Sequence, residues 1–121
     1  MGMAHADRLA SRAKDAGVQP AAIWHSGKLR ARQTAEAFLR HCNPMAEFTM
    51  VRGLLPDDPP QFARDLLAGE ARDVMLVGHM PNIRNLLSLL LPGGQDFPQH
   101  GFVALETDDD GKTWREVSRA G

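Results

Sequence analysis

The chain has 121 residues, of which 43% are hydrophobic and 24% are charged, and its formal net charge is −1 at pH 7. This composition is typical of one folded domain spanning residues 1–121, and it excludes a disordered or fibrous protein. The near-neutral charge offers no basic surface for nucleic acid or an anionic membrane, so we expect neither as a partner. The start of the chain lacks the apolar run of a signal peptide, and Cys42 is the single cysteine. We therefore expect a cytoplasmic protein without disulfides.

The first third of the chain predicts two helices around one strand. Apolar residues three and four apart predict an amphipathic helix from Ala6, with Gly17 at its C-terminal cap. No good capping residue precedes this helix, which indicates that an upstream segment is missing. Pro20 to His25 reads as a buried strand, and Leu29 to Leu39 as a second helix that Asn43-Pro44 ends.

The rest of the chain continues the alternation of strands and helices and then ends in two consecutive strands. The expected elements are a strand at 48–51, a loop at 54–60, a helix at 61–68, a strand at 73–78 and a helix at about 81–91. The strand at 73–78 is apolar throughout, as in a parallel sheet that is covered on both faces. Segments 101–107 and 113–118 flank an Asp-Gly step that predicts a hairpin. We therefore predict a three-layer α/β/α fold with a mostly parallel sheet and a C-terminal antiparallel hairpin.

Two strand ends carry residues that could bind an anion. In such sheets ligands bind at the carboxyl ends of strands, where helix N-termini present free N–H groups. Arg30 follows the first strand and could place its guanidinium on a phosphate, although a solvated surface arginine is the alternative. His79 follows the strand at 73–78 and could donate to a phosphoryl oxygen, or simply cap the strand end.

A longer pattern at the same two places resembles a known family. Ser26-Gly27-Lys28-Leu29-Arg30-Ala31-Arg32-Gln33-Thr34-Ala35, followed some fifty positions later by Gly78-His79-Met80-Pro81, resembles the histidine phosphatase superfamily and its SixA-like branch. The resemblance covers nearly the whole chain. It implies that His79 is catalytic and that Arg30 and Ser26 bind the substrate phosphate, with no metal and no cofactor.

The resemblance also defines what this sequence lacks. In the family, an Arg-His-Gly motif at the end of the first strand supplies the nucleophilic histidine, and no Arg-His-Gly occurs in these 121 residues. His5, His25, His41 and His100 match no catalytic position of the family. Asp57 and Asp58 lie in a loop where related phosphatases can carry a proton donor, but we favour the interpretation that they are turn residues.

The leading hypothesis is therefore an incomplete phosphohistidine phosphatase whose partner is a phosphorylated protein or a small phosphate ligand. The first alternative is a non-catalytic phosphate- or phosphoprotein-binding module of the same fold. The second is an α/β interaction domain without a ligand site. All three hypotheses predict the same helices and strands, so the sequence does not decide among them.

The missing first strand leads to a structural expectation. In the family this strand lies between the strand at 73–78 and the hairpin, so its loss would leave a gap within the sheet. Three arrangements would fill that gap: the hairpin moves onto Val74–Val77, a second copy exchanges a strand to form a homodimer, or an N-terminal fragment stays bound. Strand exchange has the clearest precedent, because an exposed strand edge is a template for another chain.

Overall fold

Three short parallel strands form the centre of the protein. The computed structural model describes residues 2–93 and 96–120. The strands are β1 (Ala22–His25), β2 (Glu47–Met50) and β3 (Val74–Val77), in the order β2-β1-β3. In the middle strand all four residues are buried, because its neighbours shield both edges and helices cover both faces. This arrangement confirms the predicted parallel sheet.

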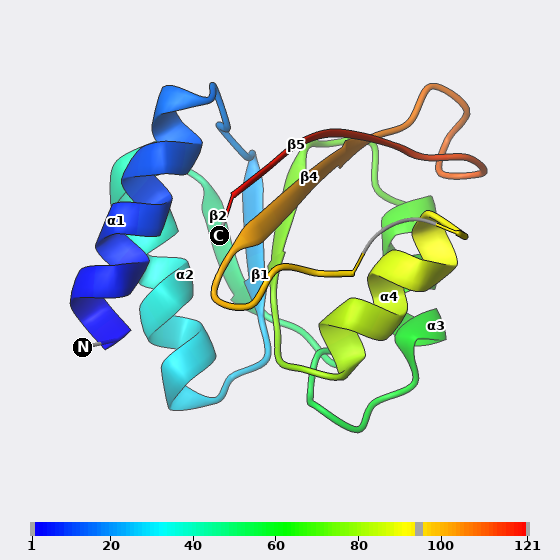
Figure 1. Ribbon diagram of the computed structural model, residues 1–121, viewed down its shortest axis with the longest axis horizontal. Helices are drawn as coiled ribbons and strands as arrows, with labels where there is room; N and C mark the ends of the chain where they lie inside the picture. The colour runs from blue at the N-terminus through cyan, green and yellow to red at the C-terminus, as the bar shows by residue number, and fades with distance from the viewer. Residues whose placement is uncertain (1, 94–95, 121) are drawn as a thin grey trace.

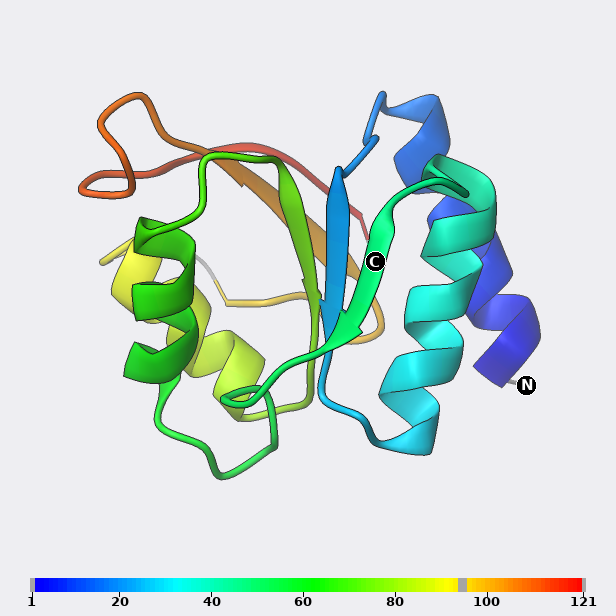
Figure 2. The same cartoon turned by 180° about the vertical axis from the view of Figure 1, so that it is seen from behind.

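In the described residues, four helices cover the sheet in two layers. They are α1 (Gly2–Asp15), α2 (Leu29–Cys42), α3 (Pro60–Ala68) and α4 (Asn82–Leu90). Figures 1 and 2 show α1 and α2 on one face and α3 and α4 on the other. Each layer has its own apolar core: Ile23 packs with the α1 and α2 side chains, whereas Trp24 packs with Leu54, Ala63 and Leu86. None of the helices in the described part of the chain combines the length and apolar character that crossing a bilayer requires.

The C-terminal cap of α1 forms as predicted. Gly17 adopts a φ of 86°, which glycine accepts without a steric cost. The Val18 N–H donates to the carbonyl of Ala13, and the Gly17 N–H donates to that of Lys14. These bonds satisfy carbonyls that the last turn of the helix would otherwise leave free.

The C-terminal hairpin also forms as predicted. β4 (Phe102–Glu106) and β5 (Arg115–Ala120) pair in antiparallel register, with an irregularity between Ala104 and Leu105. The Asp109 carboxylate accepts hydrogen bonds from the backbone N–H and the hydroxyl of Thr113, at 2.8 and 2.6 Å. Gly111 then turns the chain with a φ of 86°. The aspartate-rich segment is therefore a structured turn.

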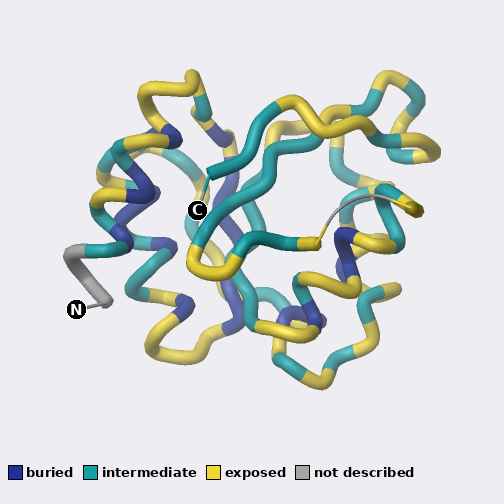
Figure 3. The backbone as a smooth tube through the Cα atoms, viewed as in Figure 1, coloured by how far each residue is buried: buried dark blue, intermediate teal, exposed yellow. Residues whose placement is uncertain are grey.

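The hairpin and the parallel sheet remain separate. Within the described residues, β4 pairs with β5 and no strand bridges β4 to β3. Of the three arrangements considered for the gap, the one in which the hairpin moves onto Val74–Val77 does not occur in this structure. Figure 3 shows that β1 is fully buried, whereas β3, most of β4 and the second half of β5 are of intermediate burial. This difference is expected for strands with one unpaired edge.

Candidate anion-binding site

Parallel pairing brings two of the predicted site residues together. β1 and β3 pair with His25 opposite Val77, so the residues that follow them leave the sheet at the same edge. Ser26 follows β1 directly, and His79 stands two residues after β3. The Ser26 Oγ lies 2.7 Å from the His79 Nε2, within hydrogen-bond distance.

The turn after β1 holds the serine hydroxyl in place. Gly27 has a φ of 92°, which reverses the chain. Its N–H donates to the His25 Nδ1 at 3.1 Å, and the Lys28 N–H donates to the Ser26 Oγ at 3.3 Å. Because Ser26 is 8% exposed, its hydroxyl has little freedom apart from rotation of its proton. The hydroxyl can donate to a neutral His79 or accept from it.

Burial favours the neutral form of His79. Loss of hydration lowers the pKa of the imidazole below its ordinary value of 6.5, and the positive charge of Lys28 lowers it further. A nearby phosphate would act in the opposite direction, since an anion favours the protonated ring. His79 is therefore placed to gain a proton when an anion binds beside it.

Arg30 lies in the first turn of α2 and is exposed. Its side chain has no hydrogen bond or ion pair with any residue that the structure describes. It lines the same cavity of about 1260 Å³ as Gly78 and His79. Arg30 is therefore an unpaired guanidinium at the mouth of the cavity that His79 also reaches.

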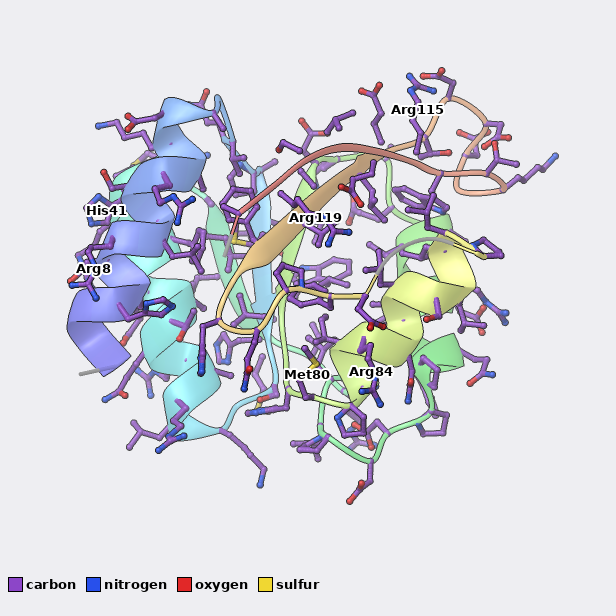
Figure 4. The ribbon with its side chains drawn as sticks, viewed as in Figure 1. Arg8, His41, Met80, Arg84, Arg115 and Arg119 are labelled. Atoms are coloured by element: carbon purple, nitrogen blue, oxygen red, sulfur yellow. The ribbon has the colours of Figure 1, made fainter. Side chains whose placement is uncertain are left out.

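The two helix starts at this edge favour an anion as well. Neither α2 nor α4 has an acidic residue in its first turn, and no side chain caps either N-terminus. In α4 the Ile83 N–H donates to the His79 carbonyl at 2.9 Å, whereas the first N–H groups of α2 have no partner among the described residues. Both starts lie at the positive end of a helix dipole. Figure 4 shows the labelled Met80 and Arg84 where β3 meets α4, at the same end of the molecule as the start of α2. The geometry suits an oxyanion with several negative oxygens.

Sequence reasoning did not find the pairing of His5 with His100. The His5 Nε2 lies 2.9 Å from the His100 carbonyl oxygen, and the two rings meet edge to face at 5.5 Å. Both line the cavity with Arg30 and His79. No sequence signal links residues 95 positions apart.

In the described part of the chain, no group of three or more His, Cys, Asp or Glu could hold a metal ion.

Asn82 also escaped the sequence reasoning, and it fixes the neighbouring loop. Its side chain is fully buried, and its Nδ2 donates to the carbonyls of Gly53 and Asp58 at 3.2 and 2.8 Å. The Asp58 carboxylate accepts the Leu55 N–H at 2.9 Å, which is a turn interaction. Neither Asp57 nor Asp58 is among the described residues that line the cavity.

The structure is similar to solved structures of histidine phosphatases. A protein from Agrobacterium tumefaciens assigned as the phosphohistidine phosphatase SixA is 26% identical, with a TM-score of 0.79 over 98% of this chain and 79% of its own. The protein histidine phosphatase SixA complexed with tungstate is 21% identical, with a TM-score of 0.83 over 97% of this chain and 78% of its own. Phosphoglycerate mutase from Plasmodium falciparum is 20% identical, with a TM-score of 0.76 over 96% of this chain and 80% of its own.

No protein-family model and no curated protein sequence matches the chain. The similarity is therefore carried by the structure, and it extends over nearly the whole chain. It confirms the histidine phosphatase fold that the sequence motifs predicted.

Proposed function

We propose that this protein holds the phosphoryl group of a phosphohistidine side chain between Arg30, Ser26 and His79, as the phosphate-binding part of a phosphohistidine phosphatase. The observation that carries the proposal is the Ser26–His79 contact of 2.7 Å beside an unpaired Arg30. Its substrate would be a phosphorylated protein or a smaller phosphate compound of the same charge.

Each group has a chemical role in this proposal. The Arg30 guanidinium donates two N–H groups to equatorial oxygens of the phosphoryl group, where negative charge is spread in the transition state. His79 gains a proton as the anion arrives and donates it in a hydrogen bond to a third oxygen. Ser26 orients the imidazole through the contact at Nε2. Free N–H groups at the start of α2 add to this anion site.

Two comparisons support the proposal. The structures of similar fold include SixA proteins, and one of them is complexed with tungstate, which is an oxyanion like phosphate.

The free and buried thiol of Cys42 fits a reducing compartment such as the cytoplasm.

A non-catalytic module that binds phosphoproteins is the second candidate. The absence of an Arg-His-Gly motif from the sequence favours it, since the resemblance places the nucleophile in that motif. Both candidates share the same anion site.

Calorimetric titration of tungstate and of phosphate tests the shared site. Arg30→Ala should weaken binding by roughly 10- to 100-fold, because a charge-assisted hydrogen bond contributes about 1.5–3 kcal/mol. Arg32→Ala is the matched control: this arginine stands on the same helix but pairs with Glu36 at 3.6 Å. Equal affinity of the wild type and Arg30→Ala would reject Arg30 as a ligand.

A further inference from the structure

Basic side chains without a partner follow all three strands of the parallel sheet. They are Lys28 and Arg30 after β1, Arg52 after β2, and Arg84 in the first turn of α4. All four are exposed, and none of their side chains has a hydrogen bond or ion pair with any residue that the structure describes. Because the net charge of the whole chain is −1, the carboxyl edge of the sheet is a local concentration of positive charge.

Acidic side chains do not fully balance this charge. The loop after β2 contains Asp57 and Asp58, and the Asp58 carboxylate is held by the Leu55 N–H at 2.9 Å. At the opposite edge of the sheet, by contrast, Arg72 pairs with two glutamates. The basic side chains at the carboxyl edge are therefore free to pair with carboxylates of another molecule.

Exposed apolar side chains lie among these charges. Three of the eight exposed large hydrophobic residues in the described part of the chain lie directly beside the anion site: Leu29, Met50 and Met80, with exposed fractions of 69, 63 and 42%. Leu29 precedes Arg30 in the chain, and Met80 follows His79. Single exposed apolar residues are normal on a protein surface, whereas a group of them around a charged site is typical of an interaction surface. Methionine and arginine are both enriched in protein interfaces.

Contacts within the structure join the end of β2 to the anion site. The Met50 Sδ occupies the place where a Cβ on Gly27 would stand, so the methionine side chain lies on the turn that carries Ser26. The Val51 N–H donates to the His25 carbonyl at 2.9 Å. Arg52, the next residue, therefore leaves the sheet beside the same turn.

We propose that six residues, which we call the rim, bind the surface of a phosphoprotein around its phosphorylated side chain: Lys28, Leu29, Met50, Arg52, Met80 and Arg84. The partner surface is acidic and apolar, because its carboxylates pair with the basic members of the rim and its apolar side chains cover the others. The phosphoryl group at the centre rests on the proposed function, and the contacts of the rim do not. A small phosphate compound would leave the rim uncovered, and a second copy of this chain would bring two positive faces together.

The test uses the whole chain and three labelled peptides built around phosphotriazolylalanine, a stable analogue of phosphohistidine. In the first peptide, glutamate and leucine residues flank the analogue. In the second, serine replaces these neighbours, and the third is the first peptide without its phosphoryl group. Fluorescence anisotropy measures the affinity of each peptide, and calorimetric titration of tungstate measures the anion site alone.

The rim predicts that the first peptide binds at least about tenfold more tightly than the serine peptide, and that added salt reduces this preference. Arg84→Glu and Met80→Ser should each remove most of the preference. Met80→Ser should leave the affinity for tungstate unchanged, since a thioether has no hydrogen-bond donor for an oxyanion. The matched controls, Arg8→Glu on α1 and Met45→Ser before β2, should keep the preference, because both positions are exposed and lie away from the carboxyl edge (Figure 4 labels Arg8).

Three further outcomes separate the rim from the proposed function. Equal affinity for the first two peptides would overturn the rim and leave the proposed function standing, because the site would then bind the phosphoryl group alone. Tighter binding of an oligothymidine with the same net charge as the first peptide would also overturn the rim, in favour of a nucleic acid. Binding of the third peptide that equals that of the first, and that Arg84→Glu weakens, would support the rim and reject the proposed function.

Discussion

The hydroxyl oxygen of Ser26 and the Nε2 of His79 are 2.7 Å apart, although 53 positions separate the two residues in the sequence. The contact exists because β1 and β3 are adjacent, parallel and in register to their last residues. It joins the turn that begins α2 to the turn that begins α4. The two helix starts are thereby held at one edge of the sheet, where an anion can meet both.

The first prediction concerns the protonation of His79. Because burial and Lys28 lower its pKa, the ring should titrate below 6.5 in the free protein. Saturating phosphate should raise that pKa, since the anion favours the charged ring. Two-dimensional NMR of the imidazole during a pH titration measures both values. An unchanged pKa in phosphate would remove His79 from the anion site.

Stability should fall in mild acid. Burial lowers the pKa values of both His25 and His79 in the folded protein, so below the ordinary value of 6.5 the unfolded chain binds more protons. With respect to these two histidines, the free energy of unfolding should be highest above about pH 6.5. It should decrease as the pH falls from there through the pKa values of His25 and His79 in the folded protein. Urea denaturation at a series of pH values measures this loss.

His25→Asn should make that pH dependence shallower, because it removes one of the two titrating rings. The asparagine carbonyl can still accept the Gly27 N–H that now reaches the His25 Nδ1 at 3.1 Å, so the turn is kept. A His25→Asn profile as steep as that of the wild type would show that another group controls acid stability.

Asn82 should be a main anchor of the loop before α3. Asn82→Ala leaves the buried carbonyl of Gly53 and the half-buried carbonyl of Asp58 without their donor and should cost about 2–4 kcal/mol of unfolding free energy. Asn85→Ala, on the exposed side of the same helix, should change it by less than about 0.5 kcal/mol. Equal losses in the two variants would contradict this role.

Turnover should be slow in the 121-residue chain. The sequence contains no Arg-His-Gly, and removal of a nucleophile has cost on the order of 10⁶ in kcat in a protease where it was measured. We expect a phosphohistidine peptide to bind without appreciable release of phosphate in a colorimetric assay. Rapid hydrolysis that His79→Ala abolishes would show that another residue of this chain supplies the nucleophile.

The elements themselves could be predicted from local sequence. Gly17 specified the end of α1, the apolar run at 73–78 specified a covered parallel strand, and the Asp-Gly step specified the hairpin. The meeting of Ser26 with His79 follows from one further rule, that parallel strands end at a common edge. These features depend on short segments and on the direction of the strands.

Features that depend on tertiary packing could not be predicted in this way. His5 and His100 meet through the placement of α1 against the segment before β4, and nothing in either local sequence encodes that contact. Local sequence gives Asn82 no role beyond that of a helix residue. Its role depends on the loop at 53–58, whose carbonyls it binds in the folded structure. The hairpin itself could be predicted from the Asp-Gly step, but its separation from β3 depends on how both sheets pack on their helices.

NMR mapping of phosphate onto the backbone amides tests the central claim, an anion site at the starts of α2 and α4, most directly. The account predicts saturable shifts that concentrate at residues 27–31 and at His79, and that become much weaker in Arg30→Ala. Shifts that gather elsewhere, or that persist at full size in Arg30→Ala, would contradict it.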